Sequence, residues 1–408
     1  MKITTINSEL DKKIINSEKV LFIQDIDGVC IPLVKDPLTR KLDKNYILAS
    51  KLLGEEFFVL TCGEHEGERG VNRIIERSLN DNKLQKSRGF YLQGLAACGV
   101  EYQDNEGNIS FEGISKTELN FLSKVPELMR PRFFSIIKNF FPLMENKTIE
   151  THIAKSICIT KFSPTINFNS LFELVKKDWV KKKEIQIKCL QMMNEIIKRA
   201  ESECLNNSFF LHISPNLGSN NGQEIMKFAT LDDIGSTDIQ LLVKGAVKDA
   251  GVMCLLNKYI GKRTGVMPFG ERFNFRNTPE TIYEKISFCK KYIKKGDMPM
   301  IIGVGDTVTS KKEDGLDTYQ RGGSDRSFLE LIQLLGEEFG VQNKIAFVDS
   351  SSGEVFRPST KETGLIGISD EDDRLNFDII FQNGPEEYIK WFINIAKKRY
   401  HFRNSKSN

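Results

Sequence analysis

Residues 21–30 read Leu21-Phe22-Ile23-Gln24-Asp25-Ile26-Asp27-Gly28-Val29-Cys30. The apolar run that contains the first of these residues begins at Lys19 and stops at two carboxylates and a glycine. A short apolar run that ends in this way is typical of a buried parallel strand, with Asp25 and Asp27 at its carboxyl end. In open α/β sheets ligands bind outside the carboxyl ends of the strands, so this end is the first candidate for a functional site.

Further apolar runs end in a similar way along the chain. Residues 56–61 end at Thr61, residues 298–305 lead into Asp306, and residues 344–348 lead into Asp349. Helices are predicted at 46–53, 281–294, 327–339 and 385–398, and one more strand is predicted at 378–381. Strands and helices that alternate at both ends of the chain predict an α/β protein whose two ends share one Rossmann-like parallel sheet.

The middle of the chain has a different pattern. It combines glycine-containing turns at 89–113, a long helical pattern at 182–204 and a strand pattern at 208–213. We therefore predict a large inserted α+β domain. The predicted boundaries are 1–63 and 241–398 for the core domain, 64–240 for the inserted domain and 399–408 for a flexible tail.

The composition excludes several classes of protein. The 58 basic and 55 acidic side chains leave a net charge of +3, without the basic excess of a nucleic-acid-binding protein. No segment approaches the ~18 apolar residues of a membrane span, and the polar N-terminus does not resemble a signal peptide. The eight cysteines are scattered without a Cys-x-x-Cys pair, which disfavours zinc and favours reduced thiols in a cytoplasmic protein.

The pair Asp25 and Asp27 has the chemistry that phosphoryl transfer needs. One carboxylate can attack phosphorus as a nucleophile. A second carboxylate can protonate the leaving oxygen and then activate the water that follows. Asp and Gly also favour ordinary surface turns, so on the pair alone a purely structural role is an equal alternative.

Other residues near strand ends extend this site. Asp306 and Asp25 together offer the oxygen ligands that Mg²⁺ prefers. The hydroxyl of Thr61 and the backbone amide of Cys62 can bind phosphate oxygens, and Lys244 offers a positive charge. Taken singly, Thr61 is an ordinary strand-end residue and Lys244 an ordinary solvated lysine. Their order along the chain favours the functional interpretation.

This ordered set resembles the motifs of the haloacid dehalogenase-like phosphatase superfamily. The resemblance implies that Asp25 forms an aspartyl-phosphate and that Asp27 acts first as general acid and then as general base. It also implies that Thr61 and Lys244 bind the phosphoryl group. The inserted domain would be the large cap that some members carry after the second motif.

The same resemblance implies a Mg²⁺ site. Its ligands would be the carboxylates of Asp25 and Asp306 and the backbone carbonyl of Asp27. The last motif of the superfamily usually carries another acid a few residues further on, and no acid stands in that place here. Asp314 and Asp325 are the alternatives for this role.

Several segments resemble the cyanobacterial glucosylglycerol-phosphate phosphatases more closely. They are residues 22–30, 33–40, 63–72, 303–310 and 321–326. This resemblance implies hydrolysis of 2-O-(α-glucosyl)glycerol 3-phosphate to glucosylglycerol, a compatible solute made under salt stress, with the synthase of that phosphate as a candidate partner. A sucrose- or trehalose-phosphate phosphatase and a catalytically silent regulatory protein that binds a phosphorylated ligand are the alternatives.

Polar residues that follow Thr61 are the candidates for sugar binding. They are Glu64, His65, Glu66, Arg69 and Asn72. Buried polar groups that match the hydroxyls of a substrate give strong discrimination between substrates. The alternative is a polar hinge loop before the helix predicted near residues 71–79.

Overall fold

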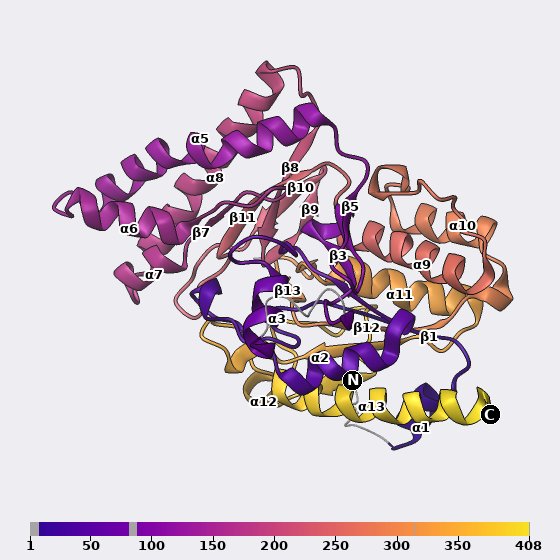
Figure 1. Ribbon diagram of the computed structural model, residues 1–408. Coiled ribbons are helices and arrows are strands. Elements are labelled where there is room, and N and C mark those ends of the chain that lie inside the picture. Colours follow the sequence, from indigo (N-terminus) through magenta and orange to yellow (C-terminus); the bar gives the residue numbers. More distant parts are fainter. Residues whose placement is uncertain (1–7, 81–87, 314, 408) are drawn as a thin grey trace. The chain divides into compact units, whose positions relative to one another are not determined.

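The computed structural model describes residues 8–80, 88–313 and 315–407, and it divides into two compact units (Figure 1). The core unit comprises the described residues up to Gly113, the segment Gly245–Thr307 and the described residues from Asp325 onward. The inserted unit comprises Ile114–Lys244 and Val308–Ser324. None of the helices in the described part of the chain has the length and apolar character that a bilayer crossing requires.

An eight-stranded sheet forms the centre of the core unit, in the order β16-β15-β12-β1-β2-β3-β4-β5. Neighbouring strands are parallel from β16 to β3 and antiparallel from β3 to β5. The strands are β1 (Val20–Gln24), β2 (Phe57–Leu60), β3 (Gly94–Ala96), β4 (Glu101–Gln103), β5 (Ile109–Phe111), β12 (Met300–Gly305), β15 (Lys344–Val348) and β16 (Ile379–Phe381). The predicted α/β class with a parallel sheet is confirmed.

Helices cover both faces of this sheet. Residues of a strand point alternately to opposite faces, and every residue of β1 is buried. On one face, Phe22 packs against Phe392 of α13 (Pro385–Ser407), which lies beside α2 (Lys44–Leu53) (Figure 1). On the other face, Gly303 lies close to side chains of α11 (Arg326–Phe339). The unit also contains α1 (Ser8–Asn16), α3 (Val71–Leu79), α9 (Lys248–Thr264), α10 (Ile282–Tyr292), α12 (Thr360–Thr363), η1 (Pro37–Thr39), η2 (Gly54–Glu56), η3 (Ala97–Gly99), η4 (Phe275–Asn277), η5 (Lys295–Asp297) and η6 (Ser350–Ser352).

The inserted unit is built on a four-stranded antiparallel sheet in the order β6-β7-β11-β8, with two additional hairpins. Its strands are β6 (Ile157–Cys158), β7 (Thr165–Asn167), β8 (Phe209–Ser214), β9 (Asn216–Asn220), β10 (Gln223–Met226), β11 (Asp238–Val243), β13 (Thr309–Lys312) and β14 (Tyr319–Gly322). Its helices are α5 (Lys116–Phe140), α6 (Asn146–Ser156), α7 (Asn169–Val175) and α8 (Trp179–Ser202). The β13–β14 hairpin is attached to β9, because Thr309 Oγ1 donates to the carbonyl of Asn216 at 2.5 Å and Gly323 N donates to Asn216 Oδ1 at 3.0 Å.

The predicted start of the inserted domain at residue 64 is wrong. The segment that follows Thr61 extends the core sheet, since β3 pairs in parallel with β2 and places Gly94 opposite Val59. β4 and β5 then continue the same sheet. These three strands have only three residues each, which is too short for a period-two pattern to stand out in the sequence. The second segment of the inserted unit, Val308–Ser324, has no counterpart in the prediction.

The predicted flexible tail after residue 398 is also wrong. Helix α13 continues to Ser407, and the side chain of Arg399 is fully buried. Its guanidinium donates to both carboxylate oxygens of Glu56, at 2.6 and 2.8 Å, and to the carbonyl of Ile14 at 2.8 Å. A two-point ion pair of this kind holds the helix on the core. The sequence conceals it because Arg399 and Glu56 lie 343 residues apart.

Candidate active site

Asp25 stands at the carboxyl end of β1, beside the neighbouring strand β12. Its backbone N–H donates to the carbonyl of Val304 at 3.0 Å, which continues the strand pairing by one residue. Its carboxylate Oδ1 accepts a hydrogen bond from the N–H of Ile26 at 2.7 Å. The side chain of Gln24 donates to the carbonyl of Asp25 at 3.0 Å. The bonds to its backbone hold Asp25 at the end of the sheet, and the bond from Ile26 orients its carboxylate.

Three buried carboxylates meet at this point: Asp25, Asp306 and Asp325. One oxygen of each lies within 4.8 Å of the others. Burial raises the pKa of Asp25 to about 7, with Lys248 acting in the opposite direction and Asp325 adding to the rise. Burial, followed by the neighbouring acids Asp325 and Asp25, raises the pKa of Asp306 well above its ordinary value. Within the described residues, the buried Oδ2 atom of Asp306 has no hydrogen-bond partner.

This donor set fits Mg²⁺. A hard cation takes carboxylate oxygens as ligands, and it removes the cost of holding several negative charges close together in a buried place. Gly28 leaves room beside the acids, because a Cβ atom at this position would lie 2.0 Å from Asp306 Oδ2. Gly28 also has a φ of +81°, a backbone conformation that favours glycine.

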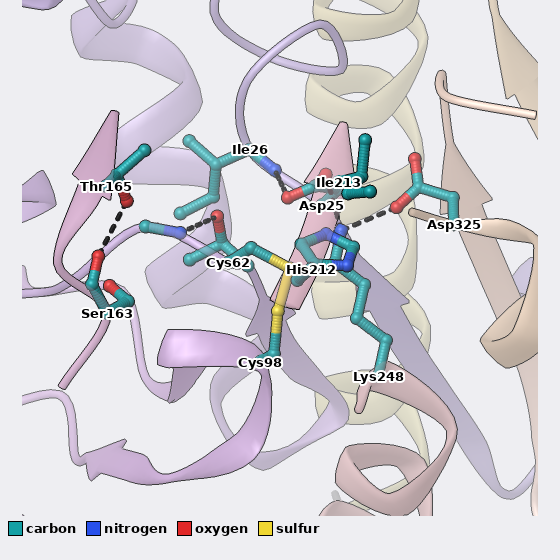
Figure 2. Close-up of a disulfide and its surroundings, with 12 residues drawn as sticks. Asp25, Ile26, Cys62, Cys98, Ser163, Thr165, His212, Ile213, Lys248 and Asp325 are labelled. Carbon is teal, nitrogen blue, oxygen red and sulfur yellow. Dashed lines mark hydrogen bonds and ion pairs between the residues drawn. A yellow bond between two sulfur atoms is a disulfide. The ribbon is translucent and has the colours of Figure 1, made fainter. Parts of the chain in front are cut away.

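Lys248 is the cation that contacts these acids. Its Nζ lies 2.6 Å from Asp25 Oδ2 and 2.5 Å from Asp325 Oδ1, and Figure 2 shows the three side chains together. Burial lowers the pKa of Lys248, but the two carboxylates outweigh this effect and hold the pKa above its ordinary value. The lysine is therefore charged and fixed next to the predicted nucleophile.

The prediction that Lys244 fills this role is wrong. Lys244 directly follows β11 in the inserted unit, is exposed and donates to Asn207 Oδ1 at 2.8 Å. Lys248 is the first residue of α9, in the core unit. The sequence offers both lysines within five residues, and a search for a lysine at the end of a strand selects Lys244. A rule that searches for a lysine at the start of a helix, instead of at the end of a strand, selects Lys248.

Asp325 takes the role for which the sequence leaves two candidates, Asp314 and Asp325. Its Oδ2 accepts the backbone N–H groups of Asp306 at 2.9 Å and Thr307 at 3.0 Å, while Oδ1 faces Lys248. The alternative, Asp314, lies outside the described residues. The chain leaves the core unit after Thr307, forms the β13–β14 hairpin of the inserted unit and returns at Asp325. This insertion explains why no acid follows Asp306 at the usual short distance.

Thr61 follows β2, the strand next to β1 in the sheet. It is buried, its N–H donates to the carbonyl of Leu95 at 2.9 Å, and its Oγ1 accepts the N–H of Gly63 at 3.2 Å. The structure therefore places Thr61 at the same end of the sheet as Asp25. Its role as a phosphate ligand stays a prediction, as does that of the Cys62 amide.

The expectation that all cysteines are reduced is wrong for Cys62 and Cys98, which form a disulfide (Figure 2). The two residues lie 36 positions apart in the sequence, and their Cα atoms are 4.3 Å apart. Pairing of β2 with β3 brings together the loops that follow these strands, and Cys98 N donates to the carbonyl of Thr61 at 3.0 Å. The sequence gives no sign of the disulfide because it does not reveal this pairing.

Replacement of both cysteines, in a Cys62→Ser and Cys98→Ser protein, is expected to lower the free energy of unfolding by about 4 kcal/mol, because the crosslink closes a long loop in the unfolded chain. Guanidinium unfolding without reductant measures the change. The matched control is Cys204→Ser, since Cys204 is a free and exposed cysteine. Equal stability of the double variant, the control and the unmodified protein would contradict the prediction.

The side chains predicted to bind sugar have several different environments. His65 is fully buried, its Nε2 lies 3.3 Å from the carbonyl of Gly94, and its Nδ1 lies 3.3 Å from the side-chain nitrogen of Gln103. Burial lowers the pKa of His65 to about 4, so the ring is neutral near pH 7. Asn72 forms a two-way amide pair with Gln103, at 2.6 and 3.1 Å. The prediction is wrong for His65, which has no exposed surface, whereas Asn72 is half-buried and its contact with sugar stays a prediction.

The other three candidates for sugar binding are not contradicted. Glu64 is buried, Glu66 is exposed and Arg69 is half-buried. Their contact with sugar stays a prediction. The backbone of this loop also caps helix α3, because the carbonyls of Glu64 and His65 accept the N–H groups of Val71 and Asn72. The loop therefore leads directly into α3, as the alternative interpretation predicts, and the capping groups are backbone carbonyls.

The second acid of the motif, Asp27, is bound by an arginine. Arg40 Nη1 donates to both carboxylate oxygens of Asp27, at 3.1 and 2.8 Å. Arg40 is absent from the predicted site, because nothing in a single sequence connects it to Asp27. The contact shows that a side chain from the loop after β1 binds the predicted acid.

Comparison with known proteins identifies a family that covers nearly the whole chain. A family model described as glucosylglycerol-phosphate phosphatase (Salt_tol_Pase) matches residues 19–396. The glucosylglycerol-phosphate phosphatase of Synechocystis sp. is 40% identical over 403 residues, which is 95% of this chain and 94% of that protein.

The solved structures that match this chain have low sequence identity and low TM-scores. Trehalose-6-phosphate phosphatase from Aspergillus fumigatus is 9% identical with a TM-score of 0.40, and the match covers 97% of this chain and 100% of that chain. The C-terminal domain of the Candida albicans (C. albicans) enzyme is 10% identical with a TM-score of 0.46, and covers 97% and 99%. At these values neither structure bears on the substrate or the site.

Proposed function

Because the chain belongs to the glucosylglycerol-phosphate phosphatase family, we propose that it hydrolyses 2-O-(α-glucosyl)glycerol 3-phosphate to glucosylglycerol and phosphate. The observation that carries the chemical part of this proposal is the contact of Lys248 with Asp25 inside a cluster of buried acids. A buried carboxylate with a fixed cation at the end of a parallel strand is suited to attack a phosphate ester. The substrate is supported by the family alone.

The proposed reaction consists of two displacements at phosphorus. In the first, an oxygen of Asp25 attacks phosphorus, the bond from phosphorus to the glycerol oxygen breaks, and Asp27 gives its proton to that oxygen. In the second, water attacks the aspartyl-phosphate and gives a proton to Asp27, and the bond from phosphorus to Asp25 breaks. Phosphate leaves, and both acids return to their initial state.

Lys248 and Thr61 are the proposed phosphate ligands of the core unit. The ammonium group of Lys248 offsets the negative charge of Asp25 and of the phosphoryl oxygens as the two approach each other. Fixed charges and dipoles of this kind provide most of the catalysis in phosphoryl transfer. Lys248 thus takes the role that the sequence analysis assigns to Lys244.

Mg²⁺ is the proposed cofactor. The carboxylates of Asp25 and Asp306 and the backbone carbonyl of Asp27 would hold it, and Asp325 would support Asp306. When bound, the ion neutralises charge on the phosphoryl oxygens. A cytoplasmic location stays a prediction from the sequence, and a role in salt tolerance and a partnership with the synthase stay predictions from the family resemblance.

Asp325→Asn is expected to weaken Mg²⁺ binding by roughly 10- to 100-fold, the usual effect of removing a group that supports a metal ligand. Titration calorimetry with Mg²⁺ measures this without reference to activity. Asp317→Asn is the matched control, because Asp317 lies between β13 and β14 and its side chain is fully exposed, at 100%. An Asp325→Asn protein that binds Mg²⁺ as tightly as the control would remove Asp325 from the site.

Phosphate release from the purified protein tests the function as a whole. The assay compares glucosylglycerol phosphate, sucrose phosphate, trehalose phosphate and an aryl phosphate, each with Mg²⁺ and with a chelator. Preference for the first substrate with Mg²⁺ supports the full proposal. Preference for another sugar phosphate keeps the chemistry and replaces the substrate. Release from none of them favours a silent regulatory protein that binds a phosphorylated ligand.

A further inference from the structure

Arg40 connects three parts of the core unit around the second acid of the motif. Nη1 donates to both oxygens of Asp27, Nε donates to the carbonyl of Pro37 at 3.1 Å, and Nη2 donates to the carbonyl of Arg69. The Arg40 side chain is 10% exposed, whereas that of Asp27 is 34% exposed. The arginine is therefore the fixed partner and the carboxylate the more accessible one.

The geometry of the guanidinium fixes the position of Asp27. An arginine is planar and presents its donors in a rigid fork, so contacts on three sides leave it little freedom. Asp27 is bonded through both carboxylate oxygens to a group that is itself held by two backbone carbonyls. A contact of this kind restricts rotation of the Asp27 side chain and holds the carboxylate near the end of β1.

The two steps of the proposed reaction depend on this restraint to different extents. In the first step, the bound substrate brings its own leaving oxygen to Asp27. In the second step the alcohol has left, and protein groups alone fix Asp27 relative to the incoming water. A general base has to lie within hydrogen-bond reach of the proton that it accepts, and small displacements cost much of the rate. The second step is thus the more sensitive one.

We propose that Arg40 is a positioning residue that holds Asp27 as the base for hydrolysis of the aspartyl-phosphate. The inference rests on the proposed function, since it requires an aspartyl-phosphate on Asp25. In this step water attacks phosphorus, its proton passes to Asp27, and the phosphorus–oxygen bond to Asp25 breaks. Arg40 stays charged and acts through its contact with Asp27.

The test is rapid mixing of Arg40→Gln with glucosylglycerol phosphate and Mg²⁺, followed by acid quenching. We expect hydrolysis of the phosphoenzyme to slow by roughly 100-fold. The alcohol should then appear in a burst close to one equivalent per enzyme, and covalent phosphate should accumulate on the protein. In the steady state kcat and KM should fall together, so that kcat/KM changes little. A merely structural role would lower kcat/KM without a burst.

Two further variants sharpen this result. Arg77→Gln is the matched control, because Arg77 is exposed and donates to the carbonyl of Leu38 at 2.7 Å, so it contacts the same loop without contacting Asp27. It should show no additional covalent phosphate. Arg40→Lys keeps one cation but loses the fork, so its burst should be intermediate, and it decides the question if Arg40→Gln does not fold.

The outcomes separate the inference from the function on which it rests. Asp27→Asn serves as the reference for a lost base. Accumulation of phosphoenzyme in Asp27→Asn but in neither Arg40 variant would overturn the role of Arg40 and leave the mechanism intact. Absence of covalent phosphate from Asp27→Asn and from the unmodified protein, with phosphate still released, would overturn the aspartyl-phosphate mechanism itself.

Discussion

Asp25→Asn is expected to lower phosphate release by roughly 10⁴-fold or more, the scale that is typical when the nucleophile of a covalent mechanism is removed. An amide is a far weaker nucleophile than a carboxylate, so neither the attack on phosphorus nor the covalent intermediate should form. The substitution preserves shape, and Lys248 keeps Asp325 as a partner. Steady-state phosphate release with Mg²⁺, together with the thermal midpoint, measures the two effects separately.

Asp349→Asn is the matched control for this prediction. Asp349 is also a buried acid directly after a parallel strand, β15, but its oxygens accept the N–H groups of Ser351 and Thr360 at 2.9 and 2.7 Å. Loss of these caps should cost about 1–2 kcal/mol of stability and leave the chemical step in place. Full turnover by Asp25→Asn would eliminate the covalent mechanism, whatever the control shows.

Lys248→Met is expected to lower kcat/KM by about 10³-fold, because fixed charge stabilisation of a transition state is typically lost on this scale when its donor is removed. It should also destabilise the fold by about 3–5 kcal/mol, since Asp25 and Asp325 would lose their buried partner. Phosphate release and guanidinium unfolding, each measured with and without Mg²⁺, separate catalysis from stability. Bound Mg²⁺ should restore part of the stability but not the rate.

Lys244→Met is the corresponding control. Lys244 is exposed and is bonded to Asn207, so its replacement should change kcat/KM by less than about twofold and stability by less than about 0.5 kcal/mol. The pair of variants decides between the two lysines directly. A large loss of activity in Lys244→Met, with Lys248→Met unaffected, would reverse the assignment.

The core of the fold and part of the site are predictable because their signals are local. The apolar runs before Asp25, Thr61 and Asp306 are short patterns, and each belongs to a parallel strand that is buried on both faces. The carboxyl ends of parallel strands lie at one end of a sheet, so residues that directly follow such runs are expected to lie near one another. This reasoning needs no knowledge of the order of the strands.

The remaining parts of the site depend on contacts between distant segments. Lys248 contacts Asp25, which lies 223 positions away in the sequence, and Asp325 is brought to Asp306 only after the hairpin of the inserted unit. The Cys62–Cys98 disulfide depends on the pairing of β2 with β3.

The sequence by itself determined the class of the fold, the nucleophile candidate and the chemistry to expect, because strand periodicity and the acids that end a strand are properties of a few consecutive residues. Only the tertiary structure decided which lysine and which further acid join Asp25, that His65 is fully buried, and that Arg40 holds Asp27. The physical reason is that a charged side chain has the same local pattern whether it is solvated or buried. Its partner is chosen by the packing of segments that are remote in the chain.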